Sequence, residues 1–214
     1  MKLEILQHHD DFVAVYKPAG LAVHQQAEAA GLTQVLARQL GVARLWLVHR
    51  LDKPTSGVLL LALNQAAASA LAQQFAAKTM RKTYLALSDG RPAKKQGWVK
   101  GDMHKARRGA WKLARSMENP AITRFYSQST APGLRLFVLQ PFGGKTHQLR
   151  VAMKSLGSPI LGDTLYCGTP AARLFLHAWK LEFSHGGRDF CICAEPDGDW
   201  PDRISDGLKS MPPF

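Results

Sequence analysis

Short apolar blocks, separated by turn residues, dominate the pattern of hydrophobic and polar positions along this chain. The block from Val58 to Leu63 is apolar at every position, which predicts a strand buried on both faces. In the block from Lys82 to Leu87, alternate side chains fall on opposite faces, so Tyr84 and Ala86 share one of them. Similar blocks predict strands at residues 12–16, 121–128, 134–140, 174–183 and 189–193.

Three helices are predicted from capping residues and from the 3.6-residue period. Thr33 is a suitable N-cap for a short helix that ends at Gly41, and Asn64 is a suitable N-cap for the alanine-rich helix after it. Between Thr146 and Gly157, apolar residues recur at i, i+3, i+4 and i+7 from Leu149 onward. We expect this third helix to be amphipathic and capped at both ends.

The predicted strands outnumber the helices, and neighbouring strands are often joined by short turns such as His185-Gly186-Gly187. This arrangement favours an α+β fold around a mixed, mainly antiparallel sheet over a doubly wound parallel one. The chain has no internal repeat and no long linker, so residues 1–214 are predicted to form a single domain. At this length a fold buries roughly 70–75% of the surface that the unfolded chain exposes, so its stability needs no disulfide or metal.

The three cysteines, Cys167, Cys191 and Cys193, predict neither a disulfide framework nor a zinc site. Their number is odd, and the Cys-x-Cys pair lacks the second pair of ligands that structural zinc needs. The N-terminus has an acid at Glu4 in place of the charge order of a signal peptide, and the longest aliphatic run is too short to span a bilayer. We therefore expect a reduced, cytoplasmic protein that does not enter a membrane.

The formal net charge is +12, and most of it lies in one stretch of the chain. Residues 78–115 contain 12 basic and 2 acidic side chains, with Tyr84, Trp98 and Trp111 between them. Phosphates supply the counter-charge for such a segment, and aromatic rings supply faces for unstacked bases, so nucleic acid is the favoured partner. Glycines and Pro92 interrupt the segment, which excludes a long helix on a membrane surface and predicts a loop that orders on binding.

Two motifs that invite a functional interpretation fail on inspection. Gly143-Gly144-Lys145-Thr146 precedes a predicted helix, but Leu139 occupies the position where a phosphate-binding loop has its first glycine. Residues 8–11, His-His-Asp-Asp, resemble a metal cluster, but adjacent side chains do not converge on one ion without a fixed loop. The chain also lacks the glycine-rich motifs of serine hydrolases and dinucleotide-binding enzymes.

The most informative stretch is His49 to Gly57, which ends where the buried apolar block begins. Its acid, Asp52, therefore lies in a polar loop set directly against rigid scaffolding, as a catalytic carboxylate requires. A purely structural interpretation is equally open from these residues alone. In it Asp52 is a turn or cap residue, and Thr55 and Ser56 make local hydrogen bonds.

The sequence His49-Arg50-Leu51-Asp52, with Thr55-Ser56-Gly57 and the apolar block after it, resembles the signature of the RluA family of pseudouridine synthases. Five further blocks of the chain are similar to that family and occur in the same order. They are Lys17–Gly20, Lys82–Leu87, Gly144–Arg150, Gly157–Tyr166 and Leu176–Ala178. The similarity extends from Phe12 to about Glu195.

This resemblance implies an enzyme that isomerises uridine to pseudouridine in RNA. The base leaves the ribose through N1 and rejoins it through C5, so the reaction requires neither a redox cofactor nor a metal. The resemblance assigns Asp52 as the essential carboxylate, acting at the ribose as a nucleophile or as a proton abstractor. The sequence leaves both roles open, and both need the ionised carboxylate.

The resemblance also assigns three residues around the target nucleotide. Arg150 is expected to pair with the catalytic aspartate and to emerge at the edge of the core. Tyr84 is expected to lie against the uracil, and Arg50 to fill the gap left when the nucleotide leaves its stack. The structural alternatives are an exposed helix arginine, a half-buried core tyrosine and an ordinary surface arginine.

The chain departs from the family pattern at Lys145, where arginine is usual, and at Ala152, where histidine is frequent. The first family block begins within twenty residues of Met1, so we expect no N-terminal RNA-binding module. The substrate, ribosomal or transfer RNA, is then recognised by the catalytic domain through residues 78–115, and we expect a monomer. Two alternatives are a catalytically inactive RNA-binding module and a hydrolase using Asp52, for which no second carboxylate motif is evident.

Overall fold

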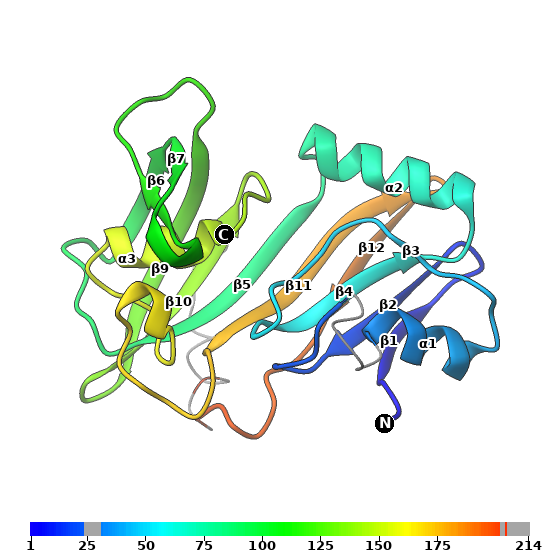
Figure 1. The fold of residues 1–214 in the computed structure, drawn as a ribbon, viewed down its shortest axis with the longest axis horizontal. Helices are drawn as coiled ribbons and strands as arrows, with labels where there is room; N and C mark the ends of the chain where they lie inside the picture. Colours follow the sequence, from blue (N-terminus) through cyan, green and yellow to red (C-terminus); the bar gives the residue numbers. More distant parts are fainter. Residues whose placement is uncertain (24–30, 202–203, 205–214) are drawn as a thin grey trace. The chain divides into compact units, whose positions relative to one another are not determined.

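The computed structural model describes residues 1–23, 31–201 and 204 of the chain (Figure 1). They form two compact units. The first comprises Met1–Lys82 and His177–Glu195, and the second comprises Thr83–Leu176 and Pro196–Phe214. Each unit combines segments that are distant in the sequence, and each has its own hydrophobic core.

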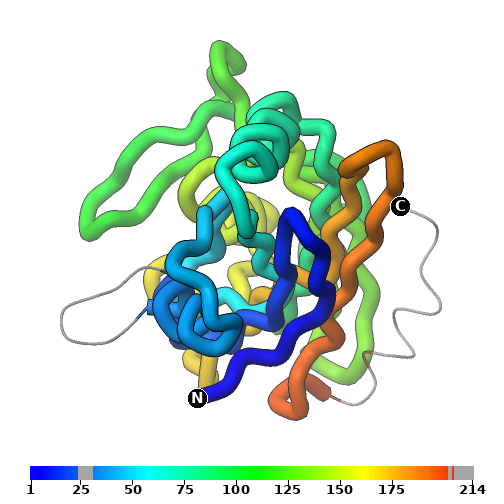
Figure 2. Tube along the Cα trace, turned by 90° about the vertical axis from the view of Figure 1, so that its right-hand side faces the viewer, coloured from blue at the N-terminus to red at the C-terminus, as the bar shows by residue number. Residues whose placement is uncertain are grey.

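The first unit is built on strands β1 (Ile5–His8), β2 (Phe12–Lys17), β4 (Ser56–Ala62), β11 (Leu176–His185) and β12 (Arg188–Cys193). They are hydrogen-bonded in that order, and β4 with β11 is the parallel pair among antiparallel ones. The sheet curls far enough for β1 to contact β12 (Figure 2). The predicted mixed, mainly antiparallel sheet is confirmed.

Strand β4 changes partner along one of its edges. β11 pairs with it at Ser56 and Gly57, whereas the short strand β3 (Trp46–Leu47) pairs with it at Leu61 and Ala62. Gly57 is needed at the first contact, because its φ is +111° and a Cβ there would lie 2.2 Å from the Ala178 carbonyl oxygen. The loop that precedes β4 therefore leads into a close approach between β4 and β11.

Helix α2 (Gln65–Ala77) covers one face of this sheet, with Leu71 fully buried in the core. Its predicted N-cap is confirmed, because the Asn64 side chain accepts the Ala67 N–H at 2.8 Å. The helix ends at Lys78 in the left-handed conformation, with φ at 61°.

Helix α1 (Leu32–Leu40) ends at Gly41 as predicted, but its N-cap is Gly31 and not Thr33. Thr33 lies inside the first turn, where its hydroxyl donates to the Val23 carbonyl at 3.4 Å. The sequence favoured Thr33 because a threonine hydroxyl is a good cap. In the structure this hydroxyl binds a carbonyl of the preceding segment, and the helix begins before Thr33.

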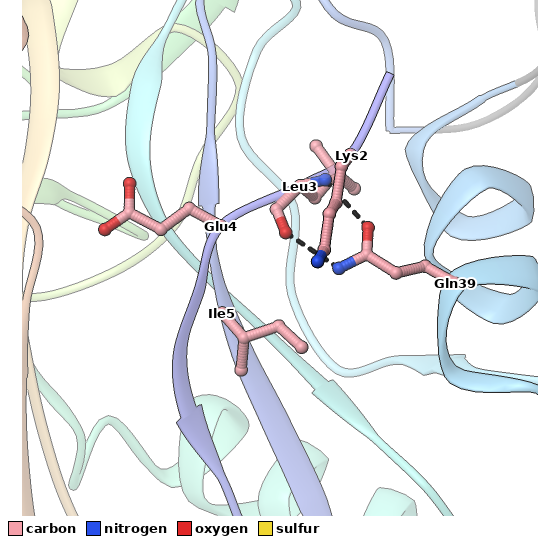
Figure 3. A pocket seen from close by; sticks show the side chains of 5 residues that line it. All are labelled: Lys2, Leu3, Glu4, Ile5 and Gln39. Atoms are coloured by element: carbon pink, nitrogen blue, oxygen red, sulfur yellow. Dashed lines mark hydrogen bonds between the residues drawn. The ribbon is translucent and has the colours of Figure 1, made fainter.

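Gln39 of α1 binds the N-terminal segment through both ends of its amide (Figure 3). Its Oε1 accepts the Leu3 N–H at 2.7 Å, and its Nε2 donates to the Leu3 carbonyl at 2.8 Å. The side-chain amide thus makes the two hydrogen bonds with Leu3 that a paired strand would otherwise make. The hollow around this contact is lined by Lys2, Leu3, Glu4, Ile5 and Gln39, none of which is a predicted site residue.

The second unit contains an antiparallel sheet in the order β5 (Arg81–Ser88), β10 (Leu134–Pro141), β9 (Ala121–Ala131) and β6 (Gln96–Gly101). Helix α3 (Gln148–Ser155) packs against β9 and β10, and its Leu149 and Met153 join the core cluster of this unit. Strands β5 and β10 lie within one residue of their predicted bounds, and β9 continues three residues beyond its predicted end. Strand β6 was not predicted.

The expectation of an amphipathic α3 with two caps is wrong at its N-terminal half. Residues 148–153 are buried on all sides, and the N-cap His147 has φ at 58° and no side-chain cap. The helix also contacts β8 (Trp111–Leu113) and the 3-10 helix η2 (Thr164–Tyr166). These elements cover the face that periodicity assigned to solvent, and Val151 packs into a cluster with them.

The basic segment is not the loop that its glycines predicted. It contains β6 and a hairpin of β7 (Met103–Lys105) and β8, with η1 (Arg107–Gly109) at the tip. Gly101 marks a close approach of backbone, because a Cβ there would lie 2.1 Å from the Ala114 carbonyl oxygen. Asp102 then accepts the Glu118 and Asn119 N–H groups at 3.0 and 2.8 Å.

Hydrogen bonds to Asp102, chiefly from the Ser116 side chain, lower the pKa of its carboxyl group and keep it ionised. The Asp102 carboxylate thus holds the backbone that follows the basic segment.

Within the described part of the chain, no helix combines the length and apolar character needed to cross a membrane.

Candidate active site

Asp52 lies in the loop between β3 and β4 of the first unit. Its side chain is half-buried, and its backbone carbonyl accepts the Thr55 N–H at 3.0 Å. This bond closes a tight turn, and β4 begins at the next residue with every side chain buried. The predicted acid is thus joined through one turn to a strand that packing holds on both faces.

Lys17, the last residue of β2, has a fully buried side chain whose ammonium group binds the Asp52 loop. Nζ donates to the carbonyl oxygens of Pro18 and Lys53 at 3.0 Å and of Thr55 at 2.7 Å. These bonds compensate part of the desolvation of a buried charge, since hydrogen bonds to ionised groups are the stronger ones. Sequence reasoning missed this role, although a lysine that ends an apolar strand was a signal for it.

His49 fixes the other end of the same loop. Its Nε2 accepts the Leu60 N–H at 2.9 Å, and Leu60 lies between the residues of β4 that pair with β11 and those that pair with β3. The imidazole stacks on the Phe75 ring with centroids 4.5 Å apart. Burial, helped by the charge of Lys82, lowers the pKa of His49 to about 3, so the ring is neutral and keeps its acceptor lone pair.

A third attachment joins β4 to β11 through buried polar groups. His177 Nδ1 lies 2.8 Å from the Ser56 hydroxyl, and its Nε2 lies 2.8 Å from the Ala194 carbonyl oxygen. Because a carbonyl only accepts, Nε2 carries the proton and Nδ1 accepts the bond from Ser56. The residue that starts β4, four positions after Asp52, is therefore fixed in one arrangement.

Arg50 lies on the same loop, two residues before Asp52, and its side chain is exposed. This position suits the RNA contact expected of Arg50, and it equally suits an ordinary surface arginine. The sequence prediction therefore stands as a prediction. The structure does place Arg50 and Asp52 on one loop that Lys17 and His49 fasten at both ends.

Tyr84 belongs to the second unit, where it stands on β5 opposite Leu139 of β10. Its side chain is half-buried against the cluster that contains Leu149 and Met153 of α3. The core therefore fixes the orientation of the ring and leaves part of it accessible, which is the environment of an aromatic platform.

Arg150, on α3 of the same unit, forms a bidentate ion pair with Asp163. Nε donates to Oδ2 at 2.8 Å and Nη2 to Oδ1 at 2.6 Å, and both side chains are buried. The expectation that Arg150 emerges at the edge of the core is wrong, because its side chain is only 9% exposed. Sequence reasoning missed Asp163, although it stands in the Gly157–Tyr166 block.

Tyr166 connects this arginine to the basic hairpin. Its ring lies under the Arg150 guanidinium, 4.9 Å from centroid to Cζ. Its hydroxyl lies 2.8 Å from His147 Nδ1 and accepts the Trp111 N–H at 3.0 Å. The N-terminal end of α3, the arginine and strand β8 are therefore joined through one buried phenol.

One group of side chains in the described part of the chain has the composition of a metal site. Potential ligand atoms of His9, Asp11 and His185 lie within 4.8 Å of one another, while the other two residues of the run 8–11 stay outside the group. Asp11 already accepts from His185 and Asn64 at 2.8 Å each, and His9 Nδ1 accepts the Asp11 N–H at 3.1 Å. The bonds from His185 and Asn64, His185 first, lower the pKa of Asp11. The group is a set of hydrogen bonds that joins two turns. Both carboxylate oxygens of Asp11 and Nδ1 of His9 already accept hydrogen bonds within the protein.

The predicted residues thus fall into two sets. Asp52 and Arg50 share a fastened loop of the first unit, and Tyr84 and Arg150 are held by the core of the second. That all four act on one nucleotide is a prediction from the resemblance.

Comparison with known proteins gives one family throughout. A sequence model described as RNA pseudouridylate synthase matches residues 11–155. A Haemophilus influenzae protein named as an uncharacterized RNA pseudouridine synthase is 55% identical, over 86% of this chain and 84% of its own. The tRNA pseudouridine synthase C of Pasteurella multocida is 36% identical over 96% of each chain.

A solved structure has the same fold. The solved structure of human RNA pseudouridylate synthase domain containing 1 superposes with a TM-score of 0.78, covering 99% of this chain and 96% of that one at 24% identity. The family match spans the Asp52 loop, Tyr84 and Arg150. On this match and these relatives, the chain belongs to the RNA pseudouridine synthase family of isomerases, in its RluA branch.

Proposed function

We propose that this protein converts a uridine of transfer or ribosomal RNA to pseudouridine, with Asp52 as the essential carboxylate. The observation that carries the proposal is the fastening of the Asp52 loop. A fully buried lysine holds two of its carbonyls, a neutral histidine holds its start, and β4 holds its end. A turn whose acid had no role beyond a local cap would not need three independent anchors.

The reaction itself moves no electrons to or from the protein. The C1′–N1 glycosidic bond of uridine breaks, the detached uracil turns, and a C1′–C5 bond forms as the hydrogen on C5 leaves as a proton and N1 gains one. An ionised Asp52 serves this reaction either by attacking C1′ or by removing a proton from the ribose. Both routes conserve atoms without a cofactor.

Arg150 is proposed to favour the ionised form of Asp52 by pairing with it. The ion pair with Asp163 uses the Nε donor and one Nη2 donor, and a guanidinium has five donors in a planar fork. Pairing with Asp163 therefore orients Arg150 without preventing a second carboxylate contact. Tyr84 is proposed to stack on the target uracil, and Arg50 to occupy the place that the everted nucleotide leaves.

The RNA around the target is proposed to contact the β7–β8 hairpin. Its tip carries Lys105, Arg107 and Arg108, all exposed, on an ordered strand pair. Three exposed cations on one hairpin supply counter-charge for the phosphates of an RNA strand. A transfer RNA is the first substrate to test, because the relative that covers nearly all of this chain is named for one.

The test measures tritium release from C5-labelled uridine in unmodified transfer RNA and ribosomal RNA. We expect release with the natural protein, no release with Asp52→Asn, and RNA affinity within a few-fold for both. Asp10→Asn, which removes an exposed acid from a turn of the same unit, is the matched control and should keep full release.

Each other outcome has a meaning. Release by Asp52→Asn at the natural rate would contradict the role of Asp52. RNA binding without release by the natural protein would indicate an inactive RNA-binding module, and free uracil as the product would indicate a hydrolase. Light scattering on the same preparations checks the expected monomer.

A further inference from the structure

Two exposed aromatic rings lie against each other in the second unit, and neither belongs to the tyrosine proposed to hold the target base. Trp98 is 50% exposed and Phe142 is 45% exposed, and their ring centroids are 5.3 Å apart at an interplanar angle of 42°. Six large hydrophobic side chains of the described residues are exposed, and these are the two aromatic ones. Exposed aromatic rings that cluster are a common mark of a binding site.

The alternation of β6 explains why the tryptophan faces outward. Val99 packs into the core cluster with α3, so its neighbours Trp98 and Lys100 lie on the opposite face of the strand. Arg124 of β9 is the residue paired with Trp98 across the ladder. The sheet therefore presents an aromatic ring and two cations on one face.

The second ring is held in place by its backbone. Phe142 follows the last residue of β10, and its N–H donates to the Ile122 carbonyl of β9 at 2.8 Å. Gln148, at the start of α3, donates to the same carbonyl at 3.0 Å. The loop that carries Phe142 is thus attached to the sheet, so the ring pair forms a fixed surface.

Two cations contact the tryptophan ring. Lys100 Nζ lies over the Trp98 ring, 5.2 Å from its centroid, and the Arg124 guanidinium carbon lies over it at 6.0 Å. Neither β6 nor β9 contains an acidic residue, so no acid on either strand offsets these charges. An aromatic face beside two cations matches a base and its flanking phosphates.

We propose that Trp98 and Phe142 form a second stacking site, which takes an unpaired base of the RNA substrate outside the target uridine. Lys100 and Arg124 bind the phosphates on either side of that base. The site would select RNA whose single-stranded region extends beyond the modified nucleotide, since a paired base presents no face to stack on. This inference rests on the proposed function, because RNA is the ligand in both.

The test compares RNA affinity and the KM and kcat for tritium release in Trp98→Ala, Phe142→Ala and the double variant. Loss of stacking should raise Kd and KM about five- to a hundredfold while kcat at saturating RNA stays near the natural value. Trp98→Phe keeps a ring and should recover much of the affinity. Met117→Ala, which removes an exposed apolar side chain that is not aromatic, is the control and should change neither constant.

Charge is tested separately. Lys100→Ala should reduce the slope of log affinity against log salt by about 0.7 if the lysine binds one phosphate of a single strand. RNA carrying 5-iodouridine at successive positions should crosslink to the peptide that contains Trp98 at one position or a few, and not at the target uridine.

The outcomes separate this inference from the proposed function. If the natural protein releases tritium and the aromatic variants keep its KM, the stacking site is overturned and the proposed function stands. If the natural protein does not release tritium, the proposed function fails first. If the natural protein is a dimer and Trp98→Ala is a monomer with unchanged KM, the surface binds a second copy and the inference is wrong.

Discussion

The guanidinium of Arg150 is bound along one edge by both carboxylate oxygens of Asp163, with Nη2 2.6 Å from Oδ1 and Nε 2.8 Å from Oδ2. Asp163 follows a glycine whose position in the turn accepts no side chain. Gly162 has φ at +79°, and a Cβ there would lie 1.8 Å from the Arg173 carbonyl oxygen. A tight glycine turn thus presents a carboxylate to a buried arginine and fixes the plane of its fork.

Replacing Asp163 by asparagine should destabilise the fold strongly. The variant removes the carboxylate charge that accepts two hydrogen bonds from the buried Arg150, and breaking a buried pair in this way typically costs about 3–5 kcal/mol. Urea unfolding measures the loss of free energy. Asp189→Asn, which removes an exposed acid from β12, should cost less than about 1 kcal/mol. Equal stabilities for the two variants would show that the ion pair does not hold the arginine.

Replacing Lys17 by methionine should reduce catalysis more than binding. The change removes the three donors that hold the carbonyls of Pro18, Lys53 and Thr55, so the Asp52 loop loses its buried anchor. We expect kcat to fall at least about tenfold, and each buried carbonyl left unpaired to cost about 1–3 kcal/mol of stability. Steady-state kinetics and thermal unfolding measure both effects.

The control for Lys17→Met is Lys53→Met, because Lys53 stands on the same loop with its side chain exposed. It removes an equal charge without touching the buried carbonyls. A large rise in KM with unchanged kcat in Lys17→Met would contradict the anchoring role and indicate an RNA contact. A kcat loss in both variants would indicate a charge effect at the loop.

The sequence predicted the mixed sheet and two helix caps, Asn64 and Gly41, correctly, because these features are set by neighbours in sequence. The run that became β4 is apolar at nearly every position, and a strand buried on both faces needs nothing more. Asn64 caps α2 through a bond to a residue three positions away. Local chemistry was sufficient in both cases.

Features set by distant segments escaped the same reasoning. Helix α3 reads as amphipathic on its own, yet β8 and η2 cover its polar side, so Arg150 became a buried residue in place of an edge one. The glycine at position 101 indicated a flexible loop, whereas it serves a close contact with Ala114. A period or a composition cannot show which segment will pack against an element.

The site was predicted in the same uneven way. Asp52 stood out because a family signature surrounds it, but the residues that fix its loop carry ordinary signals. His49 binds a backbone N–H of β4, and Lys17 binds carbonyls more than thirty residues away. The partners of both side chains are backbone atoms, which have no sequence signature of their own.

The neutral His49 predicts a loss of stability in acid. Its pKa is about 3 in the folded protein and near 6.5 when unfolded, so between these values the unfolded state binds more protons. Stability should therefore be unaffected by His49 above pH 6.5 and fall by up to about 4 kcal/mol as the pH decreases to 3. His49→Gln places an amide oxygen near the position of Nε2 and does not titrate.

The difference between the two unfolding curves isolates the histidine, because every other group titrates in both proteins. The natural protein should lose stability faster below pH 6.5 than His49→Gln. Parallel curves would mean that His49 is protonated without penalty in the folded state, and the bond to the Leu60 N–H would then be absent in solution.

The hydroxyl of Tyr166 links the basic hairpin to the end of α3, and its removal should loosen both. Tyr166→Phe keeps the ring under Arg150 but deletes the bonds to the Trp111 N–H and to His147 Nδ1, which should cost about 1–3 kcal/mol. Hydrogen exchange of the Trp111 amide should quicken, while amides of the β6–β9 ladder keep their protection. Tritium release should fall mainly through kcat, because the hairpin side chains that are proposed to contact RNA remain. If the Trp111 amide keeps its protection and kcat is unchanged, the Tyr166 hydroxyl does not couple the hairpin to Arg150.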